Sequence, residues 1–180
     1  DDADLDTAVA EIKRGSLALN GQMCTCVSRI LVHDSVYDTM KGRMAEAYEK
    51  VRTGDPMADG VELGPLIDRP NQERILGIIE RADVEANMVV RGEAPKGDLA
   101  QGCYVTPTMF EIDDISSDLV QDELFGPIVS FERFTDEADA LHKANATRYG
   151  LAASVYTNEL KRAMRMSRKL KFGTVWLNSH

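Results

Sequence analysis

Residues 17–29 read LALNGQMCTCVSR, and this stretch joins an expected helix to an expected strand through a Gly-Gln break. Cys24 lies on that turn, five residues before the strand begins at Arg29. A thiol on a helix-to-strand turn can reach a cleft while its backbone stays rigid, as a nucleophile requires. Free cysteine is more often a buried packing residue. The choice between these two roles therefore depends on the rest of the chain.

Outward from this stretch, helical and strand patterns alternate. The first helix precedes Gly21, takes Asp4 or Asp6 as its cap, and has an inner side made of Leu5, Ala8, Val9, Ile12 and Leu19. Further helices are expected over 36–51, 71–82, 136–145 and 158–170, and strands or extended segments over 29–33, 88–91, 104–110, 128–131, 151–156 and 173–177. In the last helix, Leu160, Ala163, Met164 and Ser167 are expected to face inward. This alternation predicts an α/β fold, and since no linker is visible we expect one domain over residues 1–180.

Composition excludes several classes of protein. The net charge is −9 and the acids are spread along the chain, which argues against a nucleic-acid-binding groove. No apolar run approaches the ~18 residues that would cross a membrane. The acidic first residues are unlike a signal peptide. The three cysteines are an odd number without disulfide-scaffold spacing, so a reducing, cytoplasmic location is expected.

The stretch around Cys24 resembles the active-site signature of the aldehyde dehydrogenase superfamily. That signature is Gly-Gln-x-Cys, a small residue, and Arg at the fifth position after the Cys. Four more blocks follow in the family's order: GCYVTPT at 102–108, DELFGP at 122–127, the Asn-x-x-x-Tyr-Gly-Leu and Val-Tyr-Thr pattern within 145–157, and GTVWLN at 173–178. One departure is that the family's Asn, two residues before the Gly of Gly-Gln, is Leu19 here, with Asn20 beside it. The resemblance covers nearly the whole chain.

The resemblance implies a three-layer α/β/α catalytic domain with a largely parallel sheet. It implies NAD(P)-dependent oxidation of an aldehyde to a carboxylic acid, with Cys24 as the nucleophile that forms a thiohemiacetal and then a thioester. It places Glu123 on the ribose of NAD or NADP and Phe125 against the nicotinamide. The family's cofactor-binding domain and general base are expected outside this chain, so the isolated fragment should be inactive. The full enzyme is expected to be a homo-oligomer that binds a small aldehyde, with no nucleic acid and no membrane as partners.

The sequence gives weaker support for a functional role of the other candidate residues. Arg74 could touch the cofactor, although a solvated helix face is its more ordinary role. Cys26 and Cys103 are expected to be packing residues, and oxidative pairing with Cys24 is the alternative role for Cys26. The histidines show no ligand spacing, so no metal site is expected; they are His33, His142 and His180. Two alternatives stay open: a coenzyme A-acylating member of the superfamily, and a non-catalytic structural or binding protein that keeps the fold.

Overall fold

The structure, a computed structural model, describes residues 1–82 and 84–180. Short 3-10 turns cover 18–21, 34–36 and 97–101. The main elements in chain order are α1 (Leu5–Leu17), β1 (Arg29–His33), α2 (Tyr37–Glu49), α3 (Arg69–Glu85), β2 (Asn87–Arg91), β3 (Thr108–Ile112), α4 (Asp118–Gln121), β4 (Ile128–Phe134), α5 (Glu137–Asn145), β5 (Ala152–Val155), α6 (Leu160–Lys169) and β6 (Thr174–Leu177).

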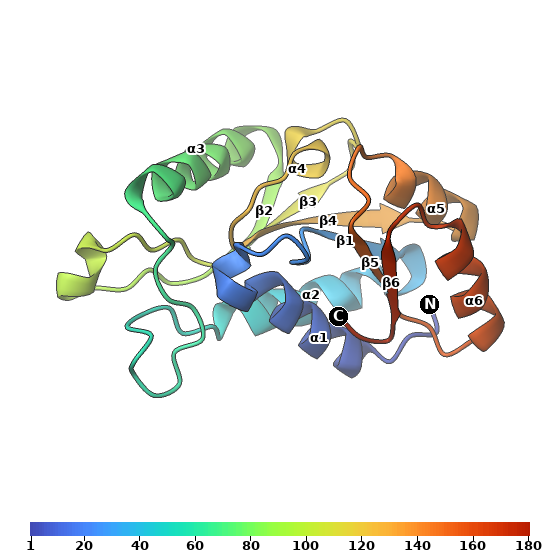
Figure 1. Cartoon of the computed structure of the whole chain (residues 1–180), viewed down its shortest axis with the longest axis horizontal. Coiled ribbons are helices and arrows are strands. Elements are labelled where there is room, and N and C mark those ends of the chain that lie inside the picture. The colour runs from blue at the N-terminus through green and yellow to red at the C-terminus, as the bar shows by residue number, and fades with distance from the viewer.

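The centre of the molecule is a four-stranded sheet in the order β1-β4-β3-β2. Strands β1, β4 and β3 are parallel, and β2 at the edge is antiparallel to β3. Figure 1 shows α1 and α2 on one side of this sheet and α3 and α4 on the other. The expected three-layer α/β/α arrangement with a largely parallel sheet is therefore confirmed.

Both faces of the sheet are packed, because successive strand residues point to opposite sides. On one face, Val129 and Phe131 of β4 join a core formed with α1 and α2. On the other, Phe110 of β3 and Ile128 of β4 pack with α3 and α4. The first five residues of β4 are buried, as expected for a strand covered on both faces, and they include the polar Ser130 and Glu132.

Local sequence explains where the longer helices begin. Asp4 is the N-cap of α1, and its carboxylate accepts a hydrogen bond from the Thr7 N–H at 2.8 Å. Asp68 caps α3 through the Asn71 N–H, with Pro70 in the first turn, where its missing N–H costs nothing. Asp136 caps α5 in the same way. The expected helices and strands are present with small shifts in their ends.

Two expectations about inner faces are wrong. Leu19 lies beyond the end of α1 and is exposed, because the chain leaves the helical conformation before it. In α6 the buried residues are Ala163 and Met166, whereas Leu160 is 73% exposed and Met164 is also exposed. The buried face of α6 therefore runs through Ala163 and Met166, and Leu160 and Met164 lie outside it.

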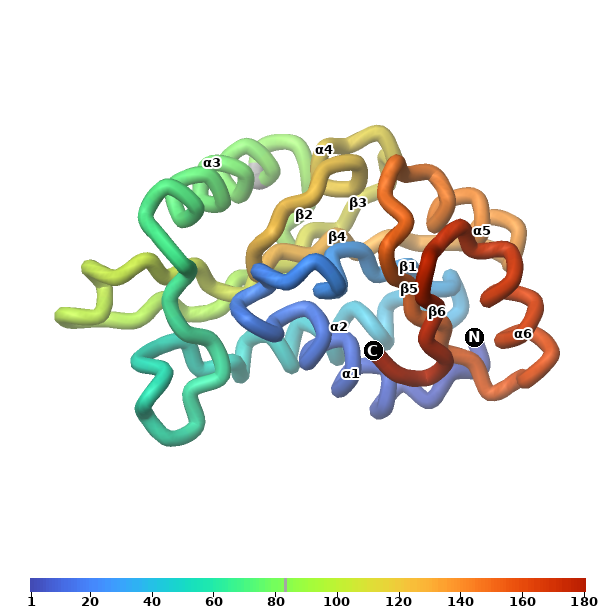
Figure 2. The backbone as a smooth tube through the Cα atoms, in the orientation of Figure 1, coloured from blue at the N-terminus to red at the C-terminus, as the bar shows by residue number. Residues whose placement is uncertain are grey.

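Strands β5 and β6 form a separate parallel pair beside the main sheet. The tube in Figure 2 shows this pair, with α6, at the C-terminal end of the colour scale and to one side of β1 and β4. The chain therefore has a large sheet packed on both faces and a smaller strand pair next to it.

Candidate functional site

The loop before β1 places Cys24 at the surface. The chain leaves α1 through Leu19, Asn20 and Gly21, whose φ angles are 47°, 60° and 71°. Such left-handed conformations are uncommon for residues other than glycine and cluster at functional sites. A turn follows in which the Cys26 N–H donates to the Met23 carbonyl at 2.9 Å. The Cys24 thiol at the tip of this turn is exposed.

Side chains just before Cys24 hold this loop against residues 64–67. The Asn20 amide nitrogen donates to the Pro65 carbonyl at 2.7 Å, and the Gly64 N–H donates to the Asn20 amide oxygen at 3.0 Å. The Gln22 side chain accepts a hydrogen bond from the Ile67 N–H at 3.3 Å. These three bonds fix the backbone that carries the cysteine.

Gly21 also brings the cysteine loop into direct backbone contact with the Glu-Leu-Phe-Gly-Pro loop at 123–127. A Cβ atom at Gly21 would lie 2.2 Å from the carbonyl oxygen of Gly126 and 2.8 Å from the Pro127 nitrogen. Those atoms are backbone and cannot move aside easily. Two motifs about a hundred residues apart in sequence therefore meet because position 21 has no side chain.

Glu123 and Phe125 extend outward from a loop that is otherwise held. Leu124, between them, is buried in the core, while both neighbours are exposed. Phe125 has a φ of 52°, which turns its ring away from the core that holds Leu124. No residue in the described ranges makes a hydrogen bond or ion pair with the Glu123 carboxylate. A free carboxylate and a partly exposed ring are thus presented side by side on a fixed backbone.

Two side chains from other elements hold this loop. Arg74 of α3 donates to the Leu124 carbonyl at 2.8 Å. The sequence suggested a loose cofactor contact or a solvated helix face for Arg74, and the structure places it instead on the loop backbone. The Glu123 N–H donates to the Tyr149 hydroxyl at 3.1 Å. The loop is therefore held from the α3 side and from the segment that leads into β5.

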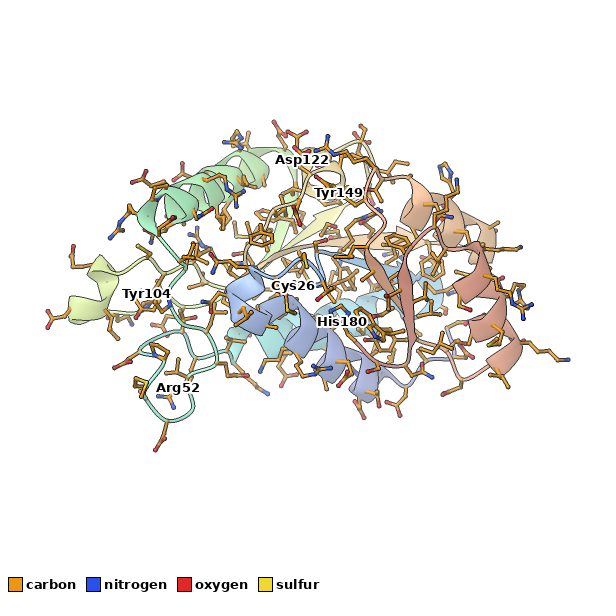
Figure 3. The ribbon with its side chains drawn as sticks, in the orientation of Figure 1. Cys26, Arg52, Tyr104, Asp122, Tyr149 and His180 are labelled. Carbon is orange, nitrogen blue, oxygen red and sulfur yellow. The ribbon has the colours of Figure 1, made fainter. Side chains whose placement is uncertain are left out.

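A cavity of about 540 Å³ lies between the main sheet and the β5–β6 pair. Residues from distant parts of the chain line it, including Cys24, Cys26, Glu123, Phe125, Tyr149 and His180. In Figure 3, Cys26 and His180 lie near the centre, Asp122 and Tyr149 above them, and Arg52 and Tyr104 on loops well away. All three residues chosen from the sequence, Cys24, Glu123 and Phe125, thus share one cavity.

The other two cysteines differ from Cys24 in their surroundings. Cys26 is half-buried and its thiol donates to the Ala18 carbonyl at 3.3 Å; burial raises the pKa of this thiol. Cys103 is half-buried near α3, away from the cavity, and its carbonyl accepts a hydrogen bond from Leu66. All three thiols are free. Cys24 is the one exposed thiol among them.

Two cavity residues were not found by sequence reasoning. Tyr149 belongs to the Asn-x-x-x-Tyr-Gly-Leu pattern. Its contact with Glu123 joins residues 26 positions apart, so no pattern of neighbouring residues could predict that contact. His180 was considered only as a metal ligand. Its Nδ1 lies 3.1 Å from the Ser154 hydroxyl, its ring meets Trp176 edge-on, and burial lowers its pKa. Within residues 1–82 and 84–180, no three His, Cys, Asp or Glu side chains group as metal ligands, and no helix is long and apolar enough to span a bilayer.

Comparison with known proteins agrees with this geometry. The model of the aldehyde dehydrogenase family matches residues 1–180. The chain is 38% identical over 184 residues to aldehyde dehydrogenase citD of Monascus ruber, covering all of this chain and 36% of that protein. It is 36% identical over 180 residues to a betaine aldehyde dehydrogenase of Cereibacter sphaeroides, covering 37% of that protein. The chain therefore spans little more than a third of the length of these relatives.

Solved structures give the same result. The crystal structure of HpcC from Thermus thermophilus superposes with a TM-score of 0.94 at 39% identity, over 99% of this chain and 36% of that one. Betaine aldehyde dehydrogenase from Staphylococcus aureus, in complex with NAD+, superposes with a TM-score of 0.95 at 35% identity, over all of this chain and 36% of that one. The cysteine loop, the Glu123–Pro127 loop and the sheet that joins them belong to a fold these proteins share, and this chain is a member of the aldehyde dehydrogenase family.

Proposed function

We propose that this chain is the catalytic portion of a longer enzyme that oxidises an aldehyde to a carboxylic acid with NAD or NADP. The observation that carries the proposal is the single cavity that exposed Cys24 shares with Glu123 and Phe125. Relatives named as aldehyde dehydrogenases, one of them solved with NAD+, support it. In this proposal the cofactor-binding domain and the general base lie outside residues 1–180.

Cys24 is the nucleophile. Its thiolate attacks the carbonyl carbon of the aldehyde, a C–S bond forms, and the π electron pair moves to oxygen to give a thiohemiacetal alkoxide. No group in the described part of the chain accepts a hydrogen bond from the Cys24 backbone N–H. That N–H is therefore available to stabilise the negative oxygen.

The alkoxide collapses with loss of hydride and leaves an acyl group bound to Cys24 as a thioester. A bound nicotinamide cofactor would supply the acceptor for this hydride. Water then attacks the thioester carbonyl, the C–S bond breaks, and the carboxylic acid leaves while the thiol is restored. The held loops around Cys24 contribute by fixing the attacking sulfur in place.

Glu123 and Phe125 fit a nicotinamide nucleotide. The unpartnered Glu123 carboxylate can accept hydrogen bonds from two ribose hydroxyls. The Phe125 ring, 39% exposed, can pack against the flat face of the nicotinamide. Both groups suit NAD and NADP equally, since neither contact involves the part of the cofactor that differs.

Alkylation of the full-length enzyme tests the role of Cys24. An exposed thiol is reached by iodoacetamide before half-buried thiols are, so Cys24 should be labelled before Cys26 and Cys103. Peptide mapping after brief labelling measures this order, and Cys103→Ser is the control that should leave the Cys24 rate unchanged. Preferential labelling of Cys26 or Cys103 would contradict the assignment.

Phe125→Ala tests the cofactor half of the proposal. The variant should slow hydride transfer more than aldehyde capture, by up to about 100-fold, because a misplacement of about 1 Å at the reacting atoms can have that effect. Single-turnover measurement of NADH formation, beside the rate of thiohemiacetal formation, separates the two steps. Unchanged hydride transfer would return Phe125 to a packing role.

We also propose a reducing, cytoplasmic location and homo-oligomeric assembly. Three free thiols, one of them exposed, are compatible with a reducing compartment. Strands β5 and β6 pair only with each other in the described part of the chain, and unpaired strand edges favour association. The isolated 180-residue chain should be inactive and dimerise; a clean monomer by sedimentation, or NADH production with any aldehyde, would contradict this view.

A further inference from the structure

The segment before β5 contacts the loop that carries Glu123 and Phe125. Arg148 and Tyr149 lie in this segment, and Figure 3 labels Tyr149 beside Asp122. The Tyr149 hydroxyl accepts two hydrogen bonds, one from the Glu123 N–H at 3.1 Å and one from Arg148 Nη2 at 3.0 Å. The same Arg148 nitrogen lies 2.9 Å from the Asp122 carboxylate.

Through these contacts, the segment before β5 positions Glu123 of the proposed cofactor site. Glu123 makes one hydrogen bond within the described residues, and it is the bond from its N–H to Tyr149. Arg148 holds the Tyr149 hydroxyl from the other side and ties it to Asp122, the residue before Glu123. The phenol oxygen therefore stays at the position where the Glu123 backbone needs an acceptor.

The position of the Glu123 backbone matters because its carboxylate is otherwise free. A carboxylate that is positioned before binding receives two ribose hydroxyls with higher affinity, since ordering it afterwards costs free energy. Arg74 fixes the following carbonyl, of Leu124, from the opposite side. Tyr149 supplies the missing restraint on the N-terminal side of the loop.

We propose that Tyr149 is a positioning residue for nicotinamide nucleotide binding, acting through the Glu123 backbone, and that Arg148 orients its hydroxyl. This inference rests on the proposed function, because it takes the dinucleotide as the ligand of Glu123. Tyr149 acts without touching the reacting carbon or the thiol of Cys24.

The test uses the full-length enzyme and measures the NAD dissociation constant by equilibrium titration, without turnover. Tyr149→Phe keeps the ring and removes the acceptor, so the constant should rise about three- to tenfold, the range for loss of one hydrogen bond. Arg148→Leu keeps the Glu123–Tyr149 bond and should give a smaller rise. Tyr104→Phe, which removes a hydroxyl far from the cavity, is the matched control and should change nothing.

A double-mutant cycle separates positioning from a general structural effect. If Tyr149 acts through Glu123, then Tyr149→Phe should have no further effect on the constant once Glu123→Ala is present. Additive effects, an unchanged constant in Tyr149→Phe, or a larger effect of Arg148→Leu than of Tyr149→Phe would overturn the inference.

The rate of Cys24 alkylation helps to distinguish failure of the Tyr149 inference from failure of the proposed function. Tyr149→Phe should leave that rate unchanged, because the hydroxyl contacts the 122–126 loop and not the cysteine turn. A wild-type enzyme that binds neither NAD nor NADP would overturn the proposed function and this inference together. The inference alone would be overturned if the wild-type enzyme binds NAD and oxidises aldehyde and the Tyr149→Phe variant has the same NAD dissociation constant.

Discussion

The four-stranded sheet and the β5–β6 pair are stabilised in different ways. In the larger sheet, the first five residues of β4 are buried and apolar side chains pack on both faces. In the smaller pair, every residue of β5 is only half-buried and the two ends of β6 are exposed. Burial dominates in the first region, and the second has too little apolar cover to be stable by burial alone.

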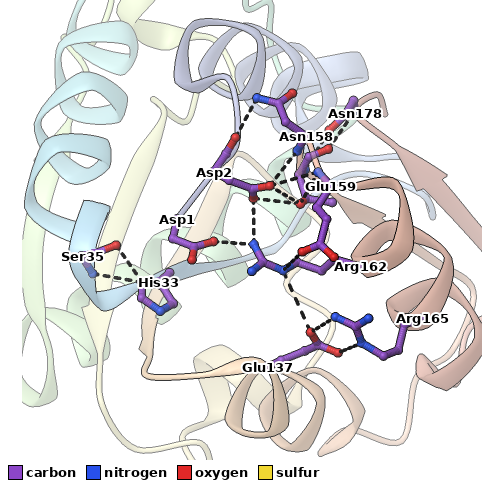
Figure 4. Close-up of polar contacts among 11 residues, drawn as sticks. Asp1, Asp2, His33, Ser35, Glu137, Asn158, Glu159, Arg162, Arg165 and Asn178 are labelled. Carbon is purple, nitrogen blue, oxygen red and sulfur yellow. Dashed lines mark hydrogen bonds and ion pairs between the residues drawn. The ribbon is translucent and has the colours of Figure 1, made fainter.

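Polar contacts of Asp1 and Asp2 add to the smaller region, as Figure 4 shows. The Asp2 carboxylate accepts hydrogen bonds from the Thr157 hydroxyl and from the N–H groups of Asn158 and Glu159, where α6 begins. Arg162 of α6 pairs with Asp2 at 2.9 Å and with Asp1. The first residues of the chain thus cap α6, whose own N-cap residue makes no side-chain capping bond.

Truncation in the larger sheet should have the greatest effect. Phe131 is fully buried in β4, with its ring centroid 5.0 Å from that of Tyr37. Phe131→Ala should lower the free energy of unfolding by about 3–5 kcal/mol, as ring-to-methyl changes in packed cores do. Denaturant titration measures it, and Phe172→Ala, in the half-buried link before β6, is the matched variant. An equal loss of unfolding free energy in the two variants would mean that burial contributes equally in the two regions.

The larger sheet also contains a buried ion pair. Glu132 of β4 is 2% exposed and accepts two hydrogen bonds from Arg29, at 2.8 and 2.7 Å, and one from the Ser130 hydroxyl. Glu132→Gln leaves the Arg29 charge buried without its partner, which should lower the free energy of unfolding by about 3 kcal/mol. Glu46→Gln, at an exposed pair with Lys50, should change little. A small loss at Glu132 would show that water compensates the charge.

The smaller region should respond to pH through Asp2. Burial tends to raise the pKa of its carboxyl, but hydrogen bonds from Thr157, Asn158 and Glu159 and the charge of Arg162 outweigh it and lower the pKa. A lowered pKa in the folded state means that Asp2 stabilises the fold above about pH 4. This contribution is lost as the pH falls through the folded-state pKa.

Asp2→Ala should therefore weaken α6 by about 1 kcal/mol near neutral pH, the size of a lost helix cap. Hydrogen exchange of the α6 amides, compared with those of β4, measures the loss region by region. The difference between variant and wild type should shrink as the pH falls through the lowered folded-state pKa of Asp2, where its carboxylate becomes protonated. Equal acceleration in β4 would show that the two regions open together.

The smallest effect is expected at the outer face of α6. Leu160→Ala removes a side chain that is largely exposed, and should change the free energy of unfolding by no more than about 0.5 kcal/mol. Met166→Ala, on the buried face of the same helix, should cost clearly more. A large loss at Leu160 would indicate that another chain or segment covers this face in solution.

Much of the fold followed from local patterns, and the errors occurred where those patterns hold too little information. The caps at Asp4, Asp68 and Asp136 and the apolar strands are local features, so the elements could be predicted from neighbouring residues. Leu160 was placed inward because apolar spacing cannot show which side of a helix meets a small sheet. The short helix α4 was missed because four residues are too few for a periodic pattern.

By itself, the sequence determined the alternation of helices and strands, the family, and the choice of Cys24, Glu123 and Phe125 as candidate site residues. These depend on residue types at short spacings, which capping, periodicity and ordered motifs record. Only the tertiary structure decided that Gly21 meets Gly126, that Arg74 and Tyr149 hold the loop between them, and that Asp2 caps α6. Such contacts join residues 26 to 157 positions apart, and they exist only after the sheet has brought those segments together.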